Sequence, residues 1–291
     1  MSAAKRFVFP LALALALSLG GLQAKQVQAQ TPLILVPSLH EQETTQEAVQ
    51  LAQEALRLAQ LGKPKEAIGL TQLSLQLAPN VSQLHFILGT LYAQQDQIPQ
   101  AIESYEDALR LDDKNSNLYL SLGLAQLKAK NYNAAVDSFN KAIALDPKSH
   151  EAFFDLGNTY YLLKRNDDAV AQWQKSVEVK NDFWPAINNI GLARYESGQV
   201  DQAIEQWQRA ISLDKEAAEP RLALGAALYQ KGDTAQGLDF TSQALKIDNR
   251  YADTAFLVEN LWGDKLVQAV REVLKTPQIQ DVLSGKSAKK S

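Results

Sequence analysis

Between residues 48 and 251, the apolar positions follow two periods at once. Over short distances they recur every three or four residues, so that Leu122, Ala125 and Ala129 share one face of an expected amphipathic helix. Over longer distances glycines return every 34 residues, at Gly89, Gly123, Gly157, Gly191 and Gly225. So strict a recurrence is typical of a repeat array, in which one supersecondary unit is stacked several times.

Six units of 34 residues fit this stretch: 48–81, 82–115, 116–149, 150–183, 184–217 and 218–251. Each is expected to form two antiparallel helices, at about positions 1–14 and 18–31 of the unit, with polar turns between them. Small residues fill position 8 (Ala55, then the five glycines), position 20 (alanine, then Gly237) and position 27 (alanine or serine). They would let neighbouring helices approach closely, where larger residues would overpack.

Large residues are expected to fill the remaining core. Position 7 is leucine or isoleucine in units two to six, and position 24 is aromatic in units two to five: Tyr105, Phe139, Trp173 and Trp207. The second helix of each unit ends in a polar turn, and in unit three Pro147 stops the helix.

The spacing of Leu122, Gly123, Ala135, Phe139, Ala142 and Pro147 resembles that of the tetratricopeptide repeat (TPR) family. The resemblance covers 48–251 and implies an all-α fold, a right-handed superhelical solenoid of stacked helix-turn-helix repeats. The terminal units depart from the pattern, since Glu54 stands at position 7 of unit one and Thr241 at position 24 of unit six. Terminal units of solenoids are often atypical.

Residues 252–284 are expected to form C-terminal capping helices, one over about 252–262 and an amphipathic one over about 264–275. Solenoids need such caps for solubility, and a separate docking helix is the alternative. The tail 285–291 is small and basic and is expected to be disordered. Its three lysines could contact a membrane surface weakly.

Residues 1–29 have the layout of a secretory signal peptide. Lys5 and Arg6 precede an apolar run of 13 residues, and small-residue exits follow at Ala24 and Ala29. The run is shorter than the roughly 20 residues that a spanning helix needs, and Pro10 lies inside it. We therefore expect export to the periplasm or an equivalent compartment, with an uncleaved membrane anchor or a buried helix as alternatives.

Residues 30–47 are interpreted as a linker. Pro32 and Pro37 argue against a helix there. The alternative is a strand-like arm, built on the apolar stretch from Leu33 to Val36, that docks on the first repeat.

Composition narrows the function. The chain has 291 residues, 46% hydrophobic and 21% charged, with a net charge of −4. These values suit a folded protein with a sizeable core. There is no basic stripe, so nucleic acid is a poor candidate partner. Cysteine is absent, which excludes disulfides, cysteine nucleophiles and thiolate metal sites.

The resemblance also implies a concave groove lined by positions 2, 5, 9, 12 and 13 of each first helix. Aromatic residues there would anchor a partner, and asparagines could hydrogen-bond an extended backbone. We therefore predict a groove that binds an apolar peptide or an amphipathic helix. Alternatively, these aromatics pack between neighbouring helices and are mostly covered. The predicted groove residues are Phe86, Leu120, Phe154, Asn158, Tyr161, Asn188, Leu192, Tyr195 and Tyr229.

No residue pattern indicates chemistry. His40, His85 and His150 lack metal-ligand spacing, and His85 is expected at a packing position. No glycine-rich phosphate loop is found. The carboxylate clamp of chaperone-adaptor TPR proteins also lacks its basic members, since Glu151 and Glu219 stand where a lysine or arginine would be needed. We expect no catalytic residue, no metal, no cofactor and no small-molecule substrate.

The predicted function is a non-catalytic protein-protein interaction scaffold, exported or membrane-tethered. The export signal narrows this role to the assembly of envelope or membrane complexes, and the similar plan of repeat proteins among photosynthetic assembly factors makes photosynthetic complexes one candidate. Two alternatives stay open: a structural protein that self-assembles by stacking through its ends, which an exposed Trp262 face would favour, and a regulatory subunit of an enzyme.

Overall fold

The computed structural model describes residues 41–285, with the side chains of 44–285. The predicted signal segment 1–29, residues 30–40 of the predicted linker and residues 286–291 of the tail lie outside the described residues. Within the described range the chain is all-helical, with fifteen α-helices, one 3-10 helix (η1) and no strand. The helices are α1 (Glu41–Gln60), α2 (Pro64–Leu77), α3 (Ser82–Gln94), α4 (Ile98–Leu111), α5 (Ser116–Lys128), α6 (Tyr132–Leu145), α7 (His150–Leu162), α8 (Asn166–Val179), α9 (Trp184–Glu196), α10 (Val200–Leu213), α11 (Ala218–Gln230), α12 (Thr234–Ile247), η1 (Asn249–Ala252), α13 (Thr254–Glu259), α14 (Asp264–Leu274) and α15 (Pro277–Leu283).

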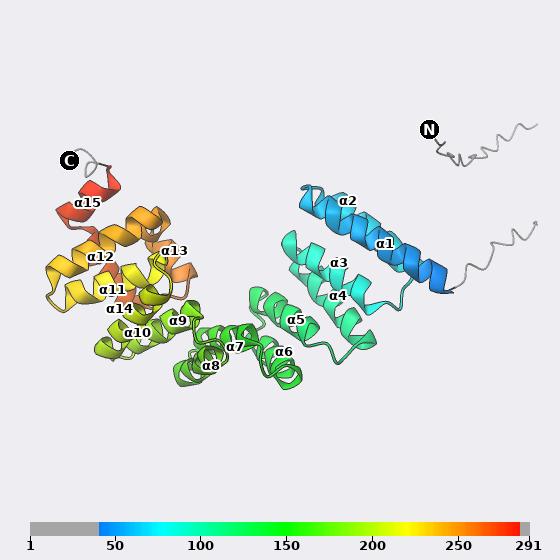
Figure 1. Ribbon diagram of the computed structural model, residues 1–291, viewed down its shortest axis with the longest axis horizontal. Helices are drawn as coiled ribbons and strands as arrows, with labels where there is room; N and C mark the ends of the chain where they lie inside the picture. The colour runs from blue at the N-terminus through cyan, green and yellow to red at the C-terminus, as the bar shows by residue number, and fades with distance from the viewer. Residues whose placement is uncertain (1–40, 286–291) are drawn as a thin grey trace, which may run out of the picture. The chain divides into compact units, whose positions relative to one another are not determined.

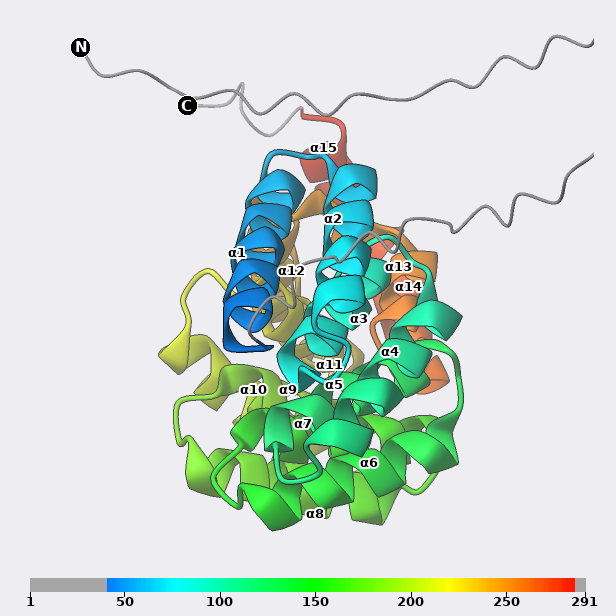
Figure 2. The ribbon, with the colours of Figure 1, turned by 90° about the vertical axis from the view of Figure 1, so that its right-hand side faces the viewer.

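Helices α1 to α12 form six consecutive pairs, and each pair also packs against the next, as α2 does on α3 and α4 on α5 (Figures 1 and 2). The stack is therefore a solenoid of helical hairpins, as the period predicts. From α3 to α11 the first helix of each pair spans positions 1–13 of its unit, and the second helices begin at position 17, one residue before the expected start. Helix α1 begins at Glu41, so the predicted linker 30–47 overlaps its first two turns.

The two helices of a pair meet where a glycine faces an aromatic ring. A Cβ atom added to Gly157 would lie 2.5 Å from the indole of Trp173, and one added to Gly191 would lie 2.5 Å from that of Trp207. Both indoles are almost completely buried. No real side chain fits in that space, so glycine at position 8 is the condition for an aromatic core at position 24.

The turn between the two helices of each pair needs a left-handed residue at position 15. Gly62, Gly198 and Gly232 supply it in units one, five and six, with φ between 73° and 94°. Units two to four place Asp96, Lys130 and Lys164 there instead, with φ of 59–62°. A residue with a Cβ in this region costs roughly 1–2 kcal/mol, so the hairpin geometry is enforced by the packing of the helices and not by the turn residue.

The C-terminal helices are distributed over two surfaces of the last repeats. Helix α15 and η1 pack on α12, the end of the stack, as expected of a cap. Helix α14 instead packs mainly on α11 and α9, which are first helices of their pairs. The helix predicted over 252–262 is divided into η1 and α13, and residues 260–263 connect α13 to α14.

None of the helices within 41–285 combines the length and the apolar character that crossing a bilayer requires.

The glycine–aromatic contact can be tested by one added methyl group. We expect Gly157→Ala to lower the free energy of unfolding by about 1–3 kcal/mol, because the methyl must displace the buried Trp173. Gly69→Ala is the matched control: Gly69 is exposed within α2 and an added Cβ meets nothing within 4 Å. It should gain up to about 1 kcal/mol from helix propensity. Urea unfolding measures both, and equal effects would contradict the close approach.

Candidate binding groove

We use the name first-helix groove for the surface formed by positions 2, 5, 9, 12 and 13 of the first helices, α1, α3, α5, α7, α9 and α11. Among the described residues, no segment covers its N-terminal half. Between α3 and α5 it contains a cavity of about 320 Å³ lined by Phe86, Leu118, Leu120 and polar side chains that include Gln83 and Asn117. On the same surface Val49, Leu56 and Leu124 are 36%, 37% and 43% exposed. Apolar side chains thus face solvent along three successive first helices.

Two of the predicted aromatics are half-buried and backed by other rings. Phe86 lies against Tyr105, with ring centroids 5.8 Å apart, and Phe154 meets Phe183 edge-on at 5.2 Å. Both keep part of their surface accessible. A ring that is fixed from behind and open in front loses little side-chain entropy on binding, which is the usual property of an anchor.

Two other predicted groove residues belong to the core. Tyr161 and Tyr195 are each 8% exposed. Their rings lie 5.7 Å from Trp173 and 5.9 Å from Trp207, respectively. The alternative reading of the sequence, that aromatics at position 12 pack between helices, describes these two.

The asparagines bind one another and the core. Asn158 Oδ1 accepts hydrogen bonds from Trp173 Nε1 at 3.1 Å and from Asn189 Nδ2 at 3.0 Å. Asn188 Nδ2 donates to Asn189 Oδ1 at 3.2 Å, while Asn188 Oδ1 is buried with no hydrogen-bond partner among the described residues. The amides expected to read a peptide backbone are therefore largely engaged in linking α7, α8 and α9.

The C-terminal half of the groove is covered by helix α14. Leu192 on α9 and Leu222 on α11 are 1% and 0% exposed and belong to one apolar cluster with Val267 and Val270 of α14. Asn188 is also 0% exposed, and Tyr229 packs at the edge of this cluster. Three predicted groove residues, Asn188, Leu192 and Tyr195, are thus inaccessible to an outside partner while α14 is in place.

Two acidic groove residues hold the C-terminal segment by its polar atoms. Glu196, at position 13 of unit five, accepts hydrogen bonds from the backbone N–H groups of Lys265 and Leu266, at 3.2 and 2.9 Å. It thereby caps the N-terminus of α14 from another helix. Glu219, at position 2 of unit six, accepts from the indole Nε1 of Trp262 at 2.9 Å.

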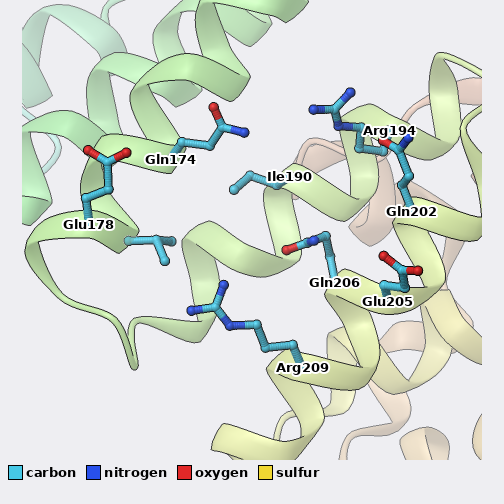
Figure 3. A pocket seen from close by; sticks show the side chains of 9 residues that line it. Gln174, Glu178, Ile190, Arg194, Gln202, Glu205, Gln206 and Arg209 are labelled. Atoms are coloured by element: carbon cyan, nitrogen blue, oxygen red, sulfur yellow. The ribbon is translucent and has the colours of Figure 1, made fainter.

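A separate cleft of about 530 Å³ lies between α8, α9 and α10, and Figure 3 shows its mixed lining of amide, acidic and basic side chains. Val177 and Ile190 lie in it, flanked by Arg194, Glu205 and Arg209. A second cleft, about 470 Å³, lies between α4, α5 and α6 and is lined from the same positions of its units. Because the cleft recurs with the repeat, we regard it as a product of helix stacking.

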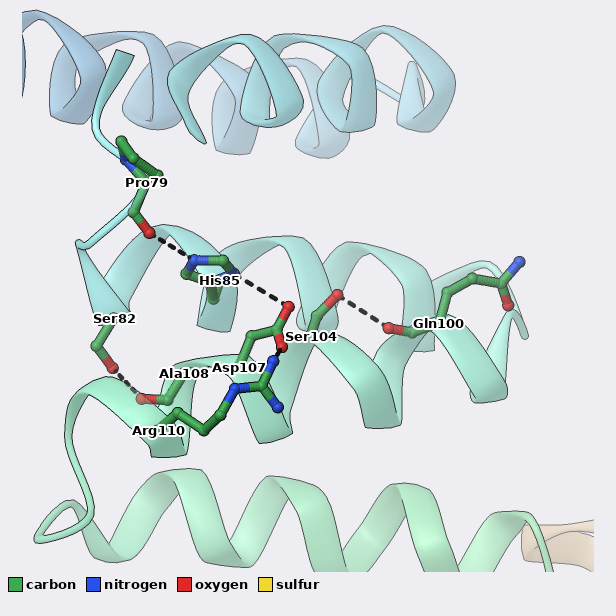
Figure 4. A network of polar contacts seen from close by, with 8 residues as sticks. All are labelled: Pro79, Ser82, His85, Gln100, Ser104, Asp107, Ala108 and Arg110. Carbon is green, nitrogen blue, oxygen red and sulfur yellow. Dashed lines mark hydrogen bonds and ion pairs between the residues drawn. The ribbon is translucent and has the colours of Figure 1, made fainter. Parts of the chain in front are cut away.

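His85 has a structural role. Its Nε2 lies 2.8 Å from the carbonyl oxygen of Pro79, and its Nδ1 lies 3.7 Å from Asp107, which also pairs with Arg110 (Figure 4). The ring therefore ties the turn before α3 to α4. In the described range no group of three or more His, Asp or Glu side chains is arranged to hold a metal ion.

Known protein families match the chain in its repeat region. A tetratricopeptide repeat profile matches residues 52–116, 86–150 and 120–182, and a second profile, described as TPR repeat, matches residues 191–232. Together the matches cover more than half of the chain. The protein belongs to the tetratricopeptide repeat family.

Solved TPR structures share the fold at low identity. PilW, described as a widely conserved type IV pilus biogenesis factor, is 17% identical, covers 82% of this chain and 99% of its own, and gives a TM-score of 0.62. Pseudomonas aeruginosa PilF is 17% identical over 84% and 99%, with a TM-score of 0.60. YrrB, described as a TPR protein with an unusual peptide-binding site, is 20% identical over 62% and 92%, with a TM-score of 0.50. No curated protein matches the chain.

The sequence pattern did not identify Glu196 and Glu219 as groove residues that bind a segment. The signal was present, because both occupy TPR groove positions and both precede a C-terminal stretch rich in apolar residues. In the sequence alone, Glu219 is recognisable only as an acid at a position where a carboxylate clamp needs a base. Glu219 binds an indole and Glu196 binds a helix N-terminus, and the spacing of residues in the sequence reveals neither contact.

Two carboxyls on first helices, Glu219 of the groove and Asp155 at position 6 of unit four, carry shifted pKa values. Burial raises the pKa of Glu219 from 4.5 to about 7, although Trp262 and Asn188 donate hydrogen bonds that favour its charged form. Burial likewise raises the pKa of Asp155 from 3.8 to about 7, against a hydrogen bond from Asn158. Between the ordinary pKa values near 4 and the raised values near 7, both carboxyls are protonated in the folded TPR domain and ionised in the unfolded chain. The free energy of unfolding therefore falls as the pH rises through this range.

We therefore expect the wild-type chain to unfold at lower urea concentration at pH 8.0 than at pH 5.5. The loss should be on the order of 2 kcal/mol, since both side chains keep some solvent contact that screens the effect. Asp155→Asn combined with Glu219→Gln should remove most of the difference, because the amides do not titrate and the introduced side-chain amide still offers Trp262 an acceptor. An unchanged pH dependence in the double variant would contradict the assignment to these two groups.

Proposed function

We propose that this TPR protein is an interaction scaffold that binds an apolar peptide or an amphipathic helix of a partner protein in the open half of the first-helix groove. The supporting observation is intramolecular: the chain's own amphipathic helix α14 already occupies the continuation of the same groove on α9 and α11. An amphipathic helix that binds the C-terminal half by apolar contact should also suit the open half, where Phe86, Leu120 and Leu124 face solvent. Phe154 and Asn158 lie at the border between the two halves.

The proposed setting is the cell envelope. The positive residues Lys5 and Arg6 followed by an apolar run favour export or membrane tethering. The fold relative PilW agrees with such a setting, since it is described as a type IV pilus biogenesis factor. We infer a role in the assembly of envelope or membrane complexes.

Self-assembly through the ends is not favoured by the contacts. That alternative would gain from an exposed tryptophan face at the C-terminal end, but Trp262 is only 4% exposed and its indole N–H is bound to Glu219. Catalysis also has no supporting site among the described residues, and TPR proteins are typically non-catalytic scaffolds.

The groove assignment is tested by placing a charge in its open half. Leu124→Asp puts a carboxylate in the apolar floor, so capture of a groove-bound partner from solubilised membranes should fall at least about tenfold. Leu111→Asp is the matched control, because Leu111 is also 43% exposed but lies at the end of a second helix, α4. Quantitative pull-down with both variants decides the matter. Equal capture by the two would place the binding surface elsewhere.

Export is tested by N-terminal sequencing of the protein purified from fractionated cells. We expect a chain in the extracytoplasmic fraction that begins after Ala24 or Ala29. An intact N-terminus in the membrane fraction would indicate the tethered form, whereas intact protein in the cytosol would contradict export.

A further inference from the structure

Helix α14 has the contacts of a bound ligand. Three side chains at spacings of four and three residues, Leu266, Val270 and Val273, form its inner face and are each 0% exposed. Gln268 and Arg271 on the outer face are exposed. The face pressed onto α9 and α11 is therefore a single apolar stripe, the arrangement with which an amphipathic helix enters a groove.

The polar contacts give this ligand a direction. The Glu196 carboxylate accepts hydrogen bonds from the backbone N–H groups of Lys265 and Leu266, in the first turn of α14. Lys265 Nζ also donates to the backbone carbonyl oxygen of Glu196 at 2.6 Å. Glu219 receives the indole of Trp262 just before the helix begins. Only a helix whose N-terminus lies at Glu196 can make these bonds, so the site distinguishes one orientation of the helix from the other.

The connection that brings α14 into the groove is packed unevenly, since Leu257 and Trp262 are buried while residues beside them are not. Leu261 has a φ of 67°, which is uncommon for a bulky side chain. Val258 is 56% exposed, and a cavity of about 340 Å³ separates Tyr161 and Lys164 from residues 258–264. Around the buried Leu257 and Trp262, the connection between α12 and α14 thus has a short helix, an exposed valine and a cavity, which are features of an element that can open locally.

We propose that the groove over α9 and α11 is a second helix-binding site, that α14 is its resident occupant, and that a partner's amphipathic helix binds there by displacing α14. The partner helix carries apolar residues at the spacing of Leu266, Val270 and Val273, a free N-terminal turn and an indole N–H before it. This inference rests on the proposed function but concerns the half of the groove that the open-groove test leaves untouched.

Because α14 is part of the same chain as the groove, it determines how weakly an outside helix is expected to bind. A tethered helix competes at an effective concentration in the millimolar range, so an outside helix binds weakly until α14 is released. Its apparent dissociation constant is the intrinsic one divided by the fraction of molecules with an open site.

The experiment uses the full chain and a fluorescein-labelled peptide with the sequence of residues 260–276. Val270→Asp in the protein places a charge on the buried face of α14 and releases it, leaving the groove itself unchanged. We expect the peptide to bind this variant at least about tenfold more tightly than the wild type in fluorescence anisotropy. Arg271→Ala, on the exposed face of α14, is the matched control and should behave as the wild type.

Two further variants locate the binding. Glu196→Gln added to Val270→Asp should weaken peptide binding about fivefold, since a neutral side chain caps a helix N-terminus less well. Leu124→Asp added to Val270→Asp should leave binding unchanged, because Leu124 lies in the open half. Loss of binding with Leu124→Asp would assign the peptide to the open half and overturn this inference while supporting the proposed function.

The proposal is also overturned if the peptide fails to bind a folded Val270→Asp variant, or binds the wild type equally well. If that variant does not unfold cooperatively, hydrogen exchange of the wild type decides. The amides of α14 should then exchange at least about tenfold faster than those of α9 and α11. Exchange of all three helices at one common rate would make α14 an integral part of the core and refute displacement.

Discussion

The structure depends on the contact between a bare backbone at position 8 and a large ring at position 24. Where Gly123 faces Phe139, an added Cβ would lie 2.6 Å from the ring. The two helices of a hairpin can therefore approach closely while the ring fills the space beside them. This contact sets the spacing within a hairpin, and repetition of the spacing every 34 residues aligns the first helices into one continuous groove.

The same contact has a polar side that differs between units. Trp173 donates its indole N–H to Asn158 and to the carbonyl oxygen of Phe154. One unit later Leu192 takes the place of Asn158, and the indole N–H of Trp207 is left without a hydrogen-bond partner among the described residues. An unpaired buried donor costs roughly 1–3 kcal/mol. Leu192 packs instead in the apolar cluster beneath α14, so unit five has an apolar contact in the covered groove where unit four has a hydrogen bond.

The hairpins could be derived from the sequence because the contacts that form them are local. Gly157 and Trp173 are 16 residues apart, and a period displays such a pair in every unit from the second to the fifth. The place of α14 could not be derived in this way. Its apolar stripe predicts that one face is buried, but the stripe is compatible with the end of the stack as well as with the groove. The position of α14 is decided by contacts between Glu196 and the start of α14, about 70 residues apart in the sequence. These contacts occur once, so no repeated pattern in the sequence reveals them.

This difference explains which groove residues remain accessible. The resemblance to TPR proteins implies one uniform groove, since every unit contributes the same positions. The chain breaks that uniformity with two acids, Glu196 and Glu219, which no earlier unit places in the same combination. They attract a helix N-terminus and an indole, and the apolar floor between them is buried by the chain itself. The repeats thus provide a single surface that the C-terminal segment divides, leaving α1, α3 and α5 as the part that meets solvent with its apolar side chains.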